Sequence, residues 1–339
     1  MPDGVTSAPP FDIASFRETK PMHRDPNLYD FWPYKDRPKI VWPGQKKLAF
    51  WVAPNIEFYE LDPPINPSRK PWGRTHPDVV PYSARDWGNR VGHWRLMEVM
   101  DECGVRGSIS LSCAMLDHHP EIIQACVDRD WEFFSHGIYN TRYSYNMTEA
   151  QERAVIEDSI KSVMDATGQR IRGYLAPALT HTERTMDLLA EYEFWYSCDL
   201  FQDDQPQPMK VKGNNRLVSM PYSLEVNDVI TYGVYHQSPR AYADALMRHF
   251  DQLLEEGEES GTVMCIPLHA YLVGHPHRMG PFREALRYIT SHRDDVWVTT
   301  AKEIAEFYLA NHYDQSLADI KARGCARPGT GFNPEGDAA

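Results

Sequence analysis

Short runs of apolar residues recur along the chain, and most of them are unbroken rather than alternating with polar residues. They include KLAFWVAPN from residue 47, WEFFSHG from residue 131, TVMCIPLHA from residue 262 and DVWVTT from residue 295. An unbroken apolar strand has both faces buried, as in a parallel sheet that is covered by helices. The runs therefore predict the strands of a largely parallel sheet.

Segments with the spacing of amphipathic helices lie between many of these runs. One of them carries Ile156 and Val163 on one face, begins with the capping pair Thr148 and Gln151, and ends at Gly168. A strand followed by a helix, repeated seven or eight times over about 260 residues, predicts a closed or nearly closed parallel (β/α) barrel of the α/β class. No G-x-G-x-x-G motif follows the first run, which disfavours a dinucleotide-binding fold.

Both ends of the chain lack this pattern. Residues 1–44 are rich in proline and have little periodicity, so we interpret them as an extended N-terminal arm that lies on the body or on a neighbouring subunit. Residues 45–313 then form a single barrel domain, and residues 314–339 form a mobile C-terminal tail.

Composition narrows the classes of partner. The chain has 48 acidic and 35 basic residues and a formal net charge of -13, which repels the phosphates of nucleic acid, so we expect no nucleic-acid partner. No apolar stretch approaches the roughly 18 residues that a membrane span needs, and the N-terminal residues do not resemble a secretion signal. Six cysteines without a C-x-x-C pair are typical of a cytoplasmic protein with free thiols.

Polar and ionisable residues stand where several of the expected strands end. They are Asn55 and Glu57 after the first strand, His136 after the third, Asp199 after the fifth, Glu225, Asn227 and Asp228 after the sixth, and His269 after the seventh. Any one of them alone has a structural explanation, since a lone histidine is usually a hydrogen-bonded core residue and a lone carboxylate is usually a helix cap. Several together at one end of a barrel are costly to bury and predict an active site.

Longer stretches carry a resemblance to a known family. GNRVGHWRLMEVMDECGVRGSISLS, SHGIYN, IRGYLAPALTHTERTMDLLAEYEFWYSCDL, IPLHAYLVGHPHRMG and VWVTTAKEIAEFY, in that order, resemble the polysaccharide deacetylase (NodB-homology, carbohydrate esterase family 4-like) superfamily. The resemblance covers about residues 38–310 and points to the branch with metal-independent allantoinase and peptidoglycan-deacetylase-like proteins. It implies a distorted (β/α) barrel, and a hydrolase of carbon–nitrogen bonds other than peptide bonds that usually carries a divalent metal.

The chain departs from the family's pattern at the site itself. Where a typical member has two aspartates on the first strand, this sequence has Asn55 and Glu57. Where the family has H-x-x-x-H it has His136 and Asn140, and where an arginine pairs with the base it has Leu175. Loss of both the acid and the arginine is coherent, because keeping one alone would leave an unpaired buried charge.

Two mechanisms remain open. In the first, Glu57 and His136, with a weak third ligand such as Asn140, hold zinc or another divalent ion that activates water. In the second, which we favour, no metal or other cofactor binds. Glu57 then accepts the proton of the attacking water, His136 orients the water or the carbonyl, and His269 protonates the leaving nitrogen.

Three further residues are assigned supporting roles. Asp199 would hold His269 in its working tautomer, as the resemblance implies from the corresponding acid of the family. Asn55 is counted in the catalytic set. The amide of Asn140 is a poor zinc ligand but a serviceable hydrogen-bond donor to the substrate carbonyl or to a developing oxyanion.

Aromatic residues near these motifs suit a compact planar substrate as readily as a sugar. We count Trp87, Tyr139 and Tyr143, together with Asn140 and Glu225, as substrate-binding. The expected substrate is a small amide, cyclic imide or ureide. Two alternatives stay open: a metal-dependent N-deacetylase of a sugar, and a catalytically inactive barrel that binds a carbohydrate or metabolite.

Two further expectations complete the interpretation. A serine or cysteine hydrolase is disfavoured, because the chain has no G-x-S-x-G motif. The proline-rich arm, and the oligomers that the family forms, favour a homo-oligomer, with a monomer wrapped by its own arm as the alternative.

Overall fold

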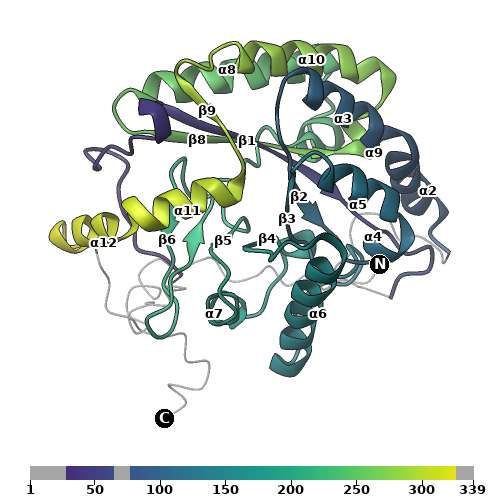
Figure 1. The fold of residues 1–339 in the computed structure, drawn as a ribbon, viewed down its shortest axis with the longest axis horizontal. Helices are drawn as coiled ribbons and strands as arrows, with labels where there is room; N and C mark the ends of the chain where they lie inside the picture. Colours follow the sequence, from purple (N-terminus) through teal and green to yellow (C-terminus); the bar gives the residue numbers. More distant parts are fainter. Residues whose placement is uncertain (1–27, 65–76, 326–339) are drawn as a thin grey trace, which may run out of the picture. The chain divides into compact units, whose positions relative to one another are not determined.

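A curled, mainly parallel sheet lies at the centre of the computed structural model, which describes residues 28–64 and 77–325 (Figure 1). Its strands are β1 Leu48–Ile56, β2 Ser108–Leu111, β3 Glu132–Ser135, β4 Gly173–Tyr174, β5 Tyr196–Ser197, β6 Gln207–Pro208, β7 Val218–Ser219, β8 Thr262–His269 and β9 Val296–Val298. The order across the sheet is β6-β7-β5-β4-β3-β2-β1-β8, and β9 pairs with β1. Among the described residues eight strands pair in parallel, and β6 runs antiparallel to β7. The predicted distorted parallel barrel is confirmed.

The first strand, β1, organises the sheet. One of its edges pairs with β8 along its length, which brings Asn55 directly beside His269. Its other edge is shared, with β9 beside Leu48–Phe50 and β2 beside Asn55 and Ile56. Since parallel strands end at the same side of a sheet, the residues that follow β1, β3 and β8 meet at one mouth of the barrel.

Helices surround the sheet (Figure 1). Most of them cover its outer face, but the last two contribute Ala301, Ile304, Ala305, Tyr308 and Tyr313 to the cluster inside the barrel. The helices are α2 Val79–Trp87, α3 His93–Glu102, α4 Met115–His118, α5 Pro120–Val127, α6 Glu149–Thr167, α7 Thr185–Glu191, α8 Pro239–Gly257, α9 Ala270–Val273, α10 Pro276–Thr290, α11 Ala301–Asn311 and α12 Tyr313–Ala322, with a π-helical turn at Gly88–Gly92 joining α2 to α3. The predicted capping box of Thr148 and Gln151 begins α6, and Gly168 ends it with a φ of 72°. The sequence therefore identified both ends of this helix.

Alternate residues of the strands face two different cores. Along β1, Leu48, Phe50 and Val52 belong to the cluster beneath the helices, whereas Trp51 and Ala53 belong to a second cluster inside the barrel. Phe134 of β3 and Cys265 of β8 also belong to the inner cluster. Side chains two residues further on along each strand point the same way, because the period of a strand is two. This alternation directs residues 55, 57, 136 and 269 toward the inside of the barrel.

The described part of the N-terminal arm, residues 28–44, packs on the body of its own chain. Arg37 donates to Asp203 Oδ1 at 2.7 Å and to Gln205 Oε1 at 3.1 Å, just before β6. Gln205 Nε2 donates to Ser260 O at 2.6 Å, just before β8. Within the described residues β6 and β8 form the two ends of the sheet without pairing, so these side chains link the two sides of the open seam. Residues 1–27 of the expected arm lie outside the described residues.

The prediction of a mobile tail from residue 314 is wrong for its first part. Residues Tyr313–Ala322 form α12, in which Tyr313 and Ile320 are buried. Trp32 of the arm donates from Nε1 to Asp319 Oδ2 of this helix at 2.8 Å. Too few apolar residues occur here for a clear periodic pattern, and the helix is held by α11 as well as by the arm, since Tyr308 Oη donates to Ser316 Oγ at 2.8 Å. Residues 326–339 lie outside the described residues.

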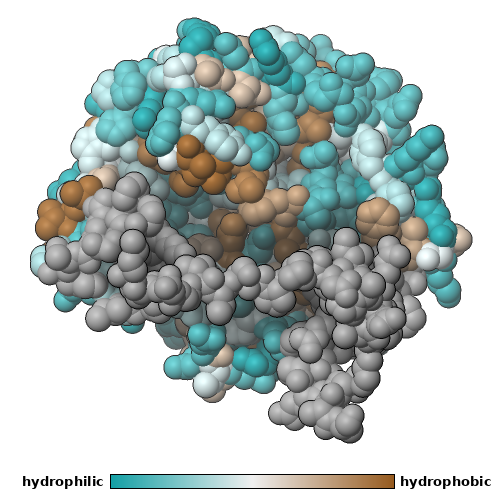
Figure 2. Space-filling model, turned by 180° about the vertical axis from the view of Figure 1, so that it is seen from behind, coloured by the Kyte–Doolittle hydropathy of each residue, from teal (hydrophilic) through white to brown (hydrophobic). Residues whose placement is uncertain are grey.

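The described surface carries apolar side chains in small separate groups. On the face in Figure 2 most described residues are hydrophilic, with brown groups set among them. No helix in the described residues is both long and apolar enough to cross a membrane. All six cysteines are free thiols, and every one except Cys325 is buried.

Candidate active site

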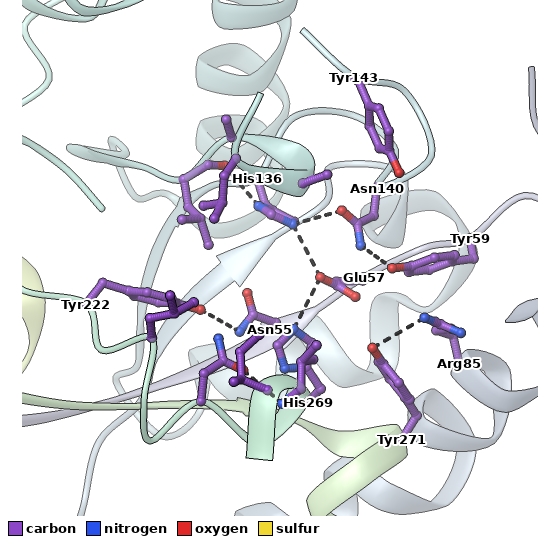
Figure 3. Close-up of a pocket in the computed structure, with 18 of the residues that line it drawn as sticks. Asn55, Glu57, Tyr59, Arg85, His136, Asn140, Tyr143, Tyr222, His269 and Tyr271 are labelled. Atoms are coloured by element: carbon purple, nitrogen blue, oxygen red, sulfur yellow. Dashed lines mark hydrogen bonds and ion pairs between the residues drawn. The ribbon is translucent and has the colours of Figure 1, made fainter. Parts of the chain in front are cut away.

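A cavity of about 250 Å³ opens at the carboxyl ends of the strands (Figure 3). Seven polar residues named from the sequence line it: Asn55, Glu57, His136, Asn140, Tyr143, Asn227 and His269. They come from the ends of β1, β3 and β8, from the segments that follow them, and from the segment after β7. One wall is apolar and includes Leu175, Leu179, Phe201, Leu224 and Ile230.

The carboxylate of Glu57 lies between two imidazoles (Figure 3). Its Oε1 is 3.3 Å from Nε2 of His136 and 3.7 Å from Nε2 of His269. Burial raises the pKa of Glu57, but the charge of His269 and the hydrogen bond and charge of His136 outweigh burial, so the pKa lies below its ordinary value. Glu57 is therefore an ionised carboxylate at neutral pH, although only 5% of it is exposed.

A second carboxylate, Asp228, holds His269 from behind. Asp228 Oδ1 accepts from His269 Nδ1 at 2.7 Å, and Asp228 Oδ2 accepts from the backbone N–H of His269 at 2.8 Å. Burial lowers the pKa of His269, but the carboxylates of Asp228 and Glu57 outweigh it, so the pKa lies above its ordinary value. His269 is thereby fixed with Nε2 toward the cavity and favours its protonated form.

The prediction that Asp199 holds His269 is wrong. Asp199 Oδ1 instead accepts from the backbone N–H of Ala176 at 2.7 Å, and Asp199 does not line the cavity. The alternation along β5 explains this, because Tyr196 and Cys198 face the inside of the barrel and Asp199 is out of phase with them. Burial raises the pKa of Asp199.

His136 is held at both ring nitrogens. Its Nδ1 is 2.9 Å from the carbonyl oxygen of Leu175, which can only accept, so Nδ1 carries a proton. Its Nε2 is 3.0 Å from Asn140 Oδ1, and Asn140 Nδ2 donates to the hydroxyl of Tyr59 at 2.6 Å. Asn140 therefore fixes the ring of His136, and the predicted role as a donor to substrate competes with this bond to Tyr59.

Asn55 is tied into the wall of the cavity. Its Nδ2 donates to the hydroxyl of Tyr222 at 3.0 Å and to the carbonyl oxygen of Leu268 at 3.2 Å. These bonds join β1 to β8 and to the segment after β7. With its amide N–H groups engaged in this way, Asn55 positions the neighbouring strand ends.

Comparisons with known proteins agree with this architecture. The sequence model of the family described as polysaccharide deacetylase matches residues 75–197. A protein of Schizosaccharomyces pombe that bears the name polysaccharide deacetylase is 27% identical over 250 residues, which are 68% of this chain and 76% of that protein. A solved structure from Pseudomonas aeruginosa PAO1, described as a polysaccharide deacetylase, has a TM-score of 0.72 and 27% identity, covering 82% of this chain and 96% of that one. In sequence and in fold, the chain is therefore similar to proteins of the polysaccharide deacetylase superfamily.

A second solved structure with a similar fold is described as an allantoinase. PuuE allantoinase has a TM-score of 0.71 and 26% identity, covering 82% of this chain and 95% of that one. The prediction of a hydrolase that acts on carbon–nitrogen bonds other than peptide bonds is thus confirmed at the level of the superfamily.

The metal site implied by the superfamily does not fit the residues present here. Asn140 stands where a second imidazole is expected, and its Oδ1 already engages Nε2 of His136, the atom that a metal would need. Among the described residues no group of three histidine, cysteine, aspartate or glutamate side chains is placed to hold a metal ion. Glu57 and His136 alone make two ligands, and protein zinc sites normally use three or four.

Three residues assigned to substrate binding lie away from the cavity. Trp87 stacks on His275 with ring centroids 4.1 Å apart. Tyr139 packs against Phe58, with ring centroids 5.9 Å apart. Glu225 lines a neighbouring cavity instead. Trp87 and Tyr139 thus have packing partners outside the pocket, and sequence proximity to the motifs was a poor guide to their position.

Sequence reasoning missed Tyr59, Arg85 and Tyr271, which also line the cavity. Tyr59 is two residues after Glu57, and Tyr271 is two residues after His269, so a period of two was a signal that could have found both. Arg85 comes from α2, within a proline-rich stretch that carries no motif. Its guanidinium lies 4.1 Å from the ring centroid of Tyr59 and 4.3 Å from that of Tyr271.

Proposed function

We propose that this protein hydrolyses the carbon–nitrogen bond of a compact amide, cyclic imide or ureide, with Glu57 as general base and His269 as general acid. The observation that carries the proposal is the placement of one ionised carboxylate between two imidazoles at a cavity wall. The pKa of Glu57 lies below its ordinary value and that of His269 above it. The two shifts favour the unprotonated form of the base and the protonated form of the acid, as the reaction needs.

The first step is attack by water on the carbonyl carbon. Oε2 of Glu57 is buried and has no hydrogen-bond partner among the described residues, so it is the atom that accepts a proton from a bound water. As the water oxygen bonds to carbon, one proton passes to Glu57 and negative charge develops on the carbonyl oxygen. His136, held by Leu175 and Asn140, keeps the carboxylate in position.

The second step breaks the carbon–nitrogen bond. His269 gives its Nε2 proton to the leaving nitrogen, while Asp228 stabilises the ring in the tautomer that keeps a proton on Nδ1. Glu57 then holds the proton from water and His269 lacks one. After the product leaves, a water molecule in the cavity returns this proton from Oε2 of Glu57 to Nε2 of His269, which lies 3.7 Å from Oε1 of the same carboxyl group, and both groups are restored.

The dimensions of the cavity support a small substrate. Its volume of about 250 Å³ lies below the usual range of drug-sized pockets, roughly 300–1,000 Å³. The wall of Leu175, Leu179, Phe201 and Leu224 suits the face of a planar ring. The likeness to PuuE allantoinase supports a ureide or imide. The relatives named as polysaccharide deacetylases favour a second candidate, an N-acetylated sugar.

A substrate panel tests the proposal. Purified protein is assayed with hydantoins, ureides, cyclic imides and N-acetylated sugars, and we expect turnover of a cyclic imide or ureide that survives a chelator and needs no added metal. Turnover of N-acetylated sugars alone would overturn the substrate assignment. Stoichiometric zinc in the purified protein, together with loss of activity on chelation, would overturn the metal-free chemistry.

A further inference from the structure

The proposed reaction leaves one charge without a stabilising partner. When water attacks, negative charge develops on the carbonyl oxygen, and hydrolases normally meet it with a metal ion or with preorganised hydrogen-bond donors. His269 is committed to the leaving nitrogen, and Asn140 donates to Tyr59. If the proposed function holds, on which this inference rests, another group of this chain stabilises the oxyanion.

Arg85 is a cation in the wall of the same cavity (Figure 3). Its guanidinium lies between the rings of Tyr59 and Tyr271, and Nη2 is 3.4 Å from the Tyr271 hydroxyl. Burial lowers the pKa of Arg85, but Tyr59, Tyr271 and Glu57 outweigh burial and the pKa lies above its ordinary value. Arg85 therefore stays charged throughout the reaction.

Arg85 is not neutralised by a fixed carboxylate. Among the residues that the structure describes, no aspartate or glutamate forms an ion pair with it. Its Nε is buried and has no hydrogen-bond partner among them. A buried donor that lacks an acceptor costs about 1–3 kcal/mol, so an oxygen that enters the cavity and accepts from it is favoured.

Arg85 and Glu57 line the same cavity, and each has one atom without a hydrogen-bond partner among the described residues: Nε of Arg85 and Oε2 of Glu57. They are complementary: the carboxylate oxygen requires an O–H or N–H donor, and the guanidinium requires an oxygen acceptor. Attacking water and a carbonyl group together supply this pair. A stacked arginine that served only packing would have no need to line the cavity that contains the base.

We propose that the guanidinium of Arg85 binds the carbonyl oxygen of the scissile bond and stabilises the negative charge that develops there. The oxygen gains this charge as the water–carbon bond forms. It loses the charge again when the carbonyl re-forms and the nitrogen leaves with the proton of His269. Arg85 acts on charge alone and exchanges no proton.

Three substitutions at Arg85, one of them with a chemical rescue, test this role. Arg85→Gln and Arg85→Lys are compared with the wild type on the substrate that it turns over, and Arg90→Gln, at an exposed position three residues after the end of α2, is the matched control. Removing an oxyanion donor typically lowers kcat about 10²–10³-fold. We expect that loss in kcat with Arg85→Gln, with KM changed much less, and no loss with Arg90→Gln. Methylguanidinium added to Arg85→Ala should restore part of kcat in a saturable way.

The outcomes separate this inference from the proposed function. If the wild type is active and the kcat of Arg85→Gln lies within about threefold of the wild-type kcat, this inference is overturned but the proposed function is not. A loss confined to KM, and to substrates with a second carbonyl, would also overturn it and assign Arg85 to ring recognition. A lower Tm without methylguanidinium rescue would make Arg85 structural. A wild type that turns over no member of the panel would overturn the proposed function, and this inference with it.

Discussion

Two buried carboxylates lie at opposite ends of the same barrel. They are Glu132, at the start of β3, and Glu57, just after β1, and each residue is 5% exposed. Glu132 accepts hydrogen bonds from Ser108 Oγ at 2.8 Å, Tyr196 Oη at 2.6 Å and the backbone N–H of Lys302 at 2.9 Å. Burial raises its pKa above the ordinary value, against these hydrogen bonds. Glu57 is flanked by imidazoles, and its pKa is shifted the other way.

The comparison shows that burial by itself does not identify a functional carboxylate. Glu132 is bonded on both oxygens to uncharged donors, so it joins β2, β3, β5 and α11 and has no oxygen left for chemistry. Glu57 faces two titratable rings and keeps one oxygen without a partner among the described residues. The kind of donor and the completeness of its bonding distinguish the structural carboxylate from the reactive one.

The largest expected effect is on the reactive carboxylate. Glu57→Gln removes the proton acceptor, so kcat should fall about 10³-fold or more, since general base catalysis contributes 10²–10⁴. Glu98→Gln, on the exposed side of α3, is the control for an equal change of charge. Steady-state kinetics check this. A Glu57→Gln enzyme with at least one tenth of wild-type kcat would remove Glu57 from the role of base.

The next effect concerns the acid. Asp228→Asn removes the carboxylate that raises the pKa of His269, so the alkaline limb of the pH–rate profile should move to lower pH and kcat should fall about 10²-fold. Asp199→Asn should leave the alkaline limb in place, because Asp199 does not contact His269. If the two variants gave the reverse result, the assignment of Asp228 would be wrong.

At the other end of the barrel the effect should be on stability instead. Glu132→Gln replaces an oxygen that accepts hydrogen bonds with an amide N–H₂ group, which would face other donors. The free energy of unfolding should therefore fall by about 1–3 kcal/mol. The kcat of the folded variant should stay within about threefold of the wild type. Urea denaturation and steady-state kinetics on the same preparation measure both quantities. A large loss of kcat without a loss of stability would contradict the comparison.

The smallest effect is a difference in pH dependence. The folded-state pKa of Glu57 lies below 4.5, so its contribution to stability is present above pH 4.5 and is lost as the pH falls through the folded pKa. The folded-state pKa of Glu132 lies above 4.5, so its contribution is present below pH 4.5 and is lost as the pH rises. From pH 3 to pH 7, the difference in unfolding free energy between the wild type and Glu57→Gln should therefore grow. The difference between the wild type and Glu132→Gln should shrink over the same range.

Most of the fold followed from local rules. Unbroken apolar runs identified the strands, and the caps of α6 identified its ends. The ends of the apolar runs indicated Glu57, His136 and His269, which line one cavity, because parallel strands end at the same side of a sheet. Their convergence also depended on strand order, which repeated strand–helix units largely determine.

The rest of the site depends on contacts that no local pattern encodes. Asp228, named as a strand-end residue, precedes the π-helical turn Val229–Val234 and reaches His269 across 41 residues of sequence. The strand ends did not indicate which carboxylate would pair with His269. Asp199 was assigned to the site as a strand-end residue and from the resemblance, whereas the period of two along β5 excludes it, because Tyr196 and Cys198 face the inside of the barrel. Arg85 enters from a helix that follows a proline-rich stretch, where neither periodicity nor a motif indicated a direction toward the cavity.

The packing of residues 28–44 determines at which residue a stable recombinant fragment of this protein should begin. Arg37 donates to Asp203 and Gln205 just before β6, and the backbone N–H of Ile40 donates to Ser260 O just before β8 at 2.9 Å, so the arm bridges the two free ends of the sheet. Trp32, Ile40 and Trp42 are buried in the same interface. A recombinant fragment that began at residue 45, at the boundary suggested by the apolar pattern, would lack this fastening and expose the inner core along one side.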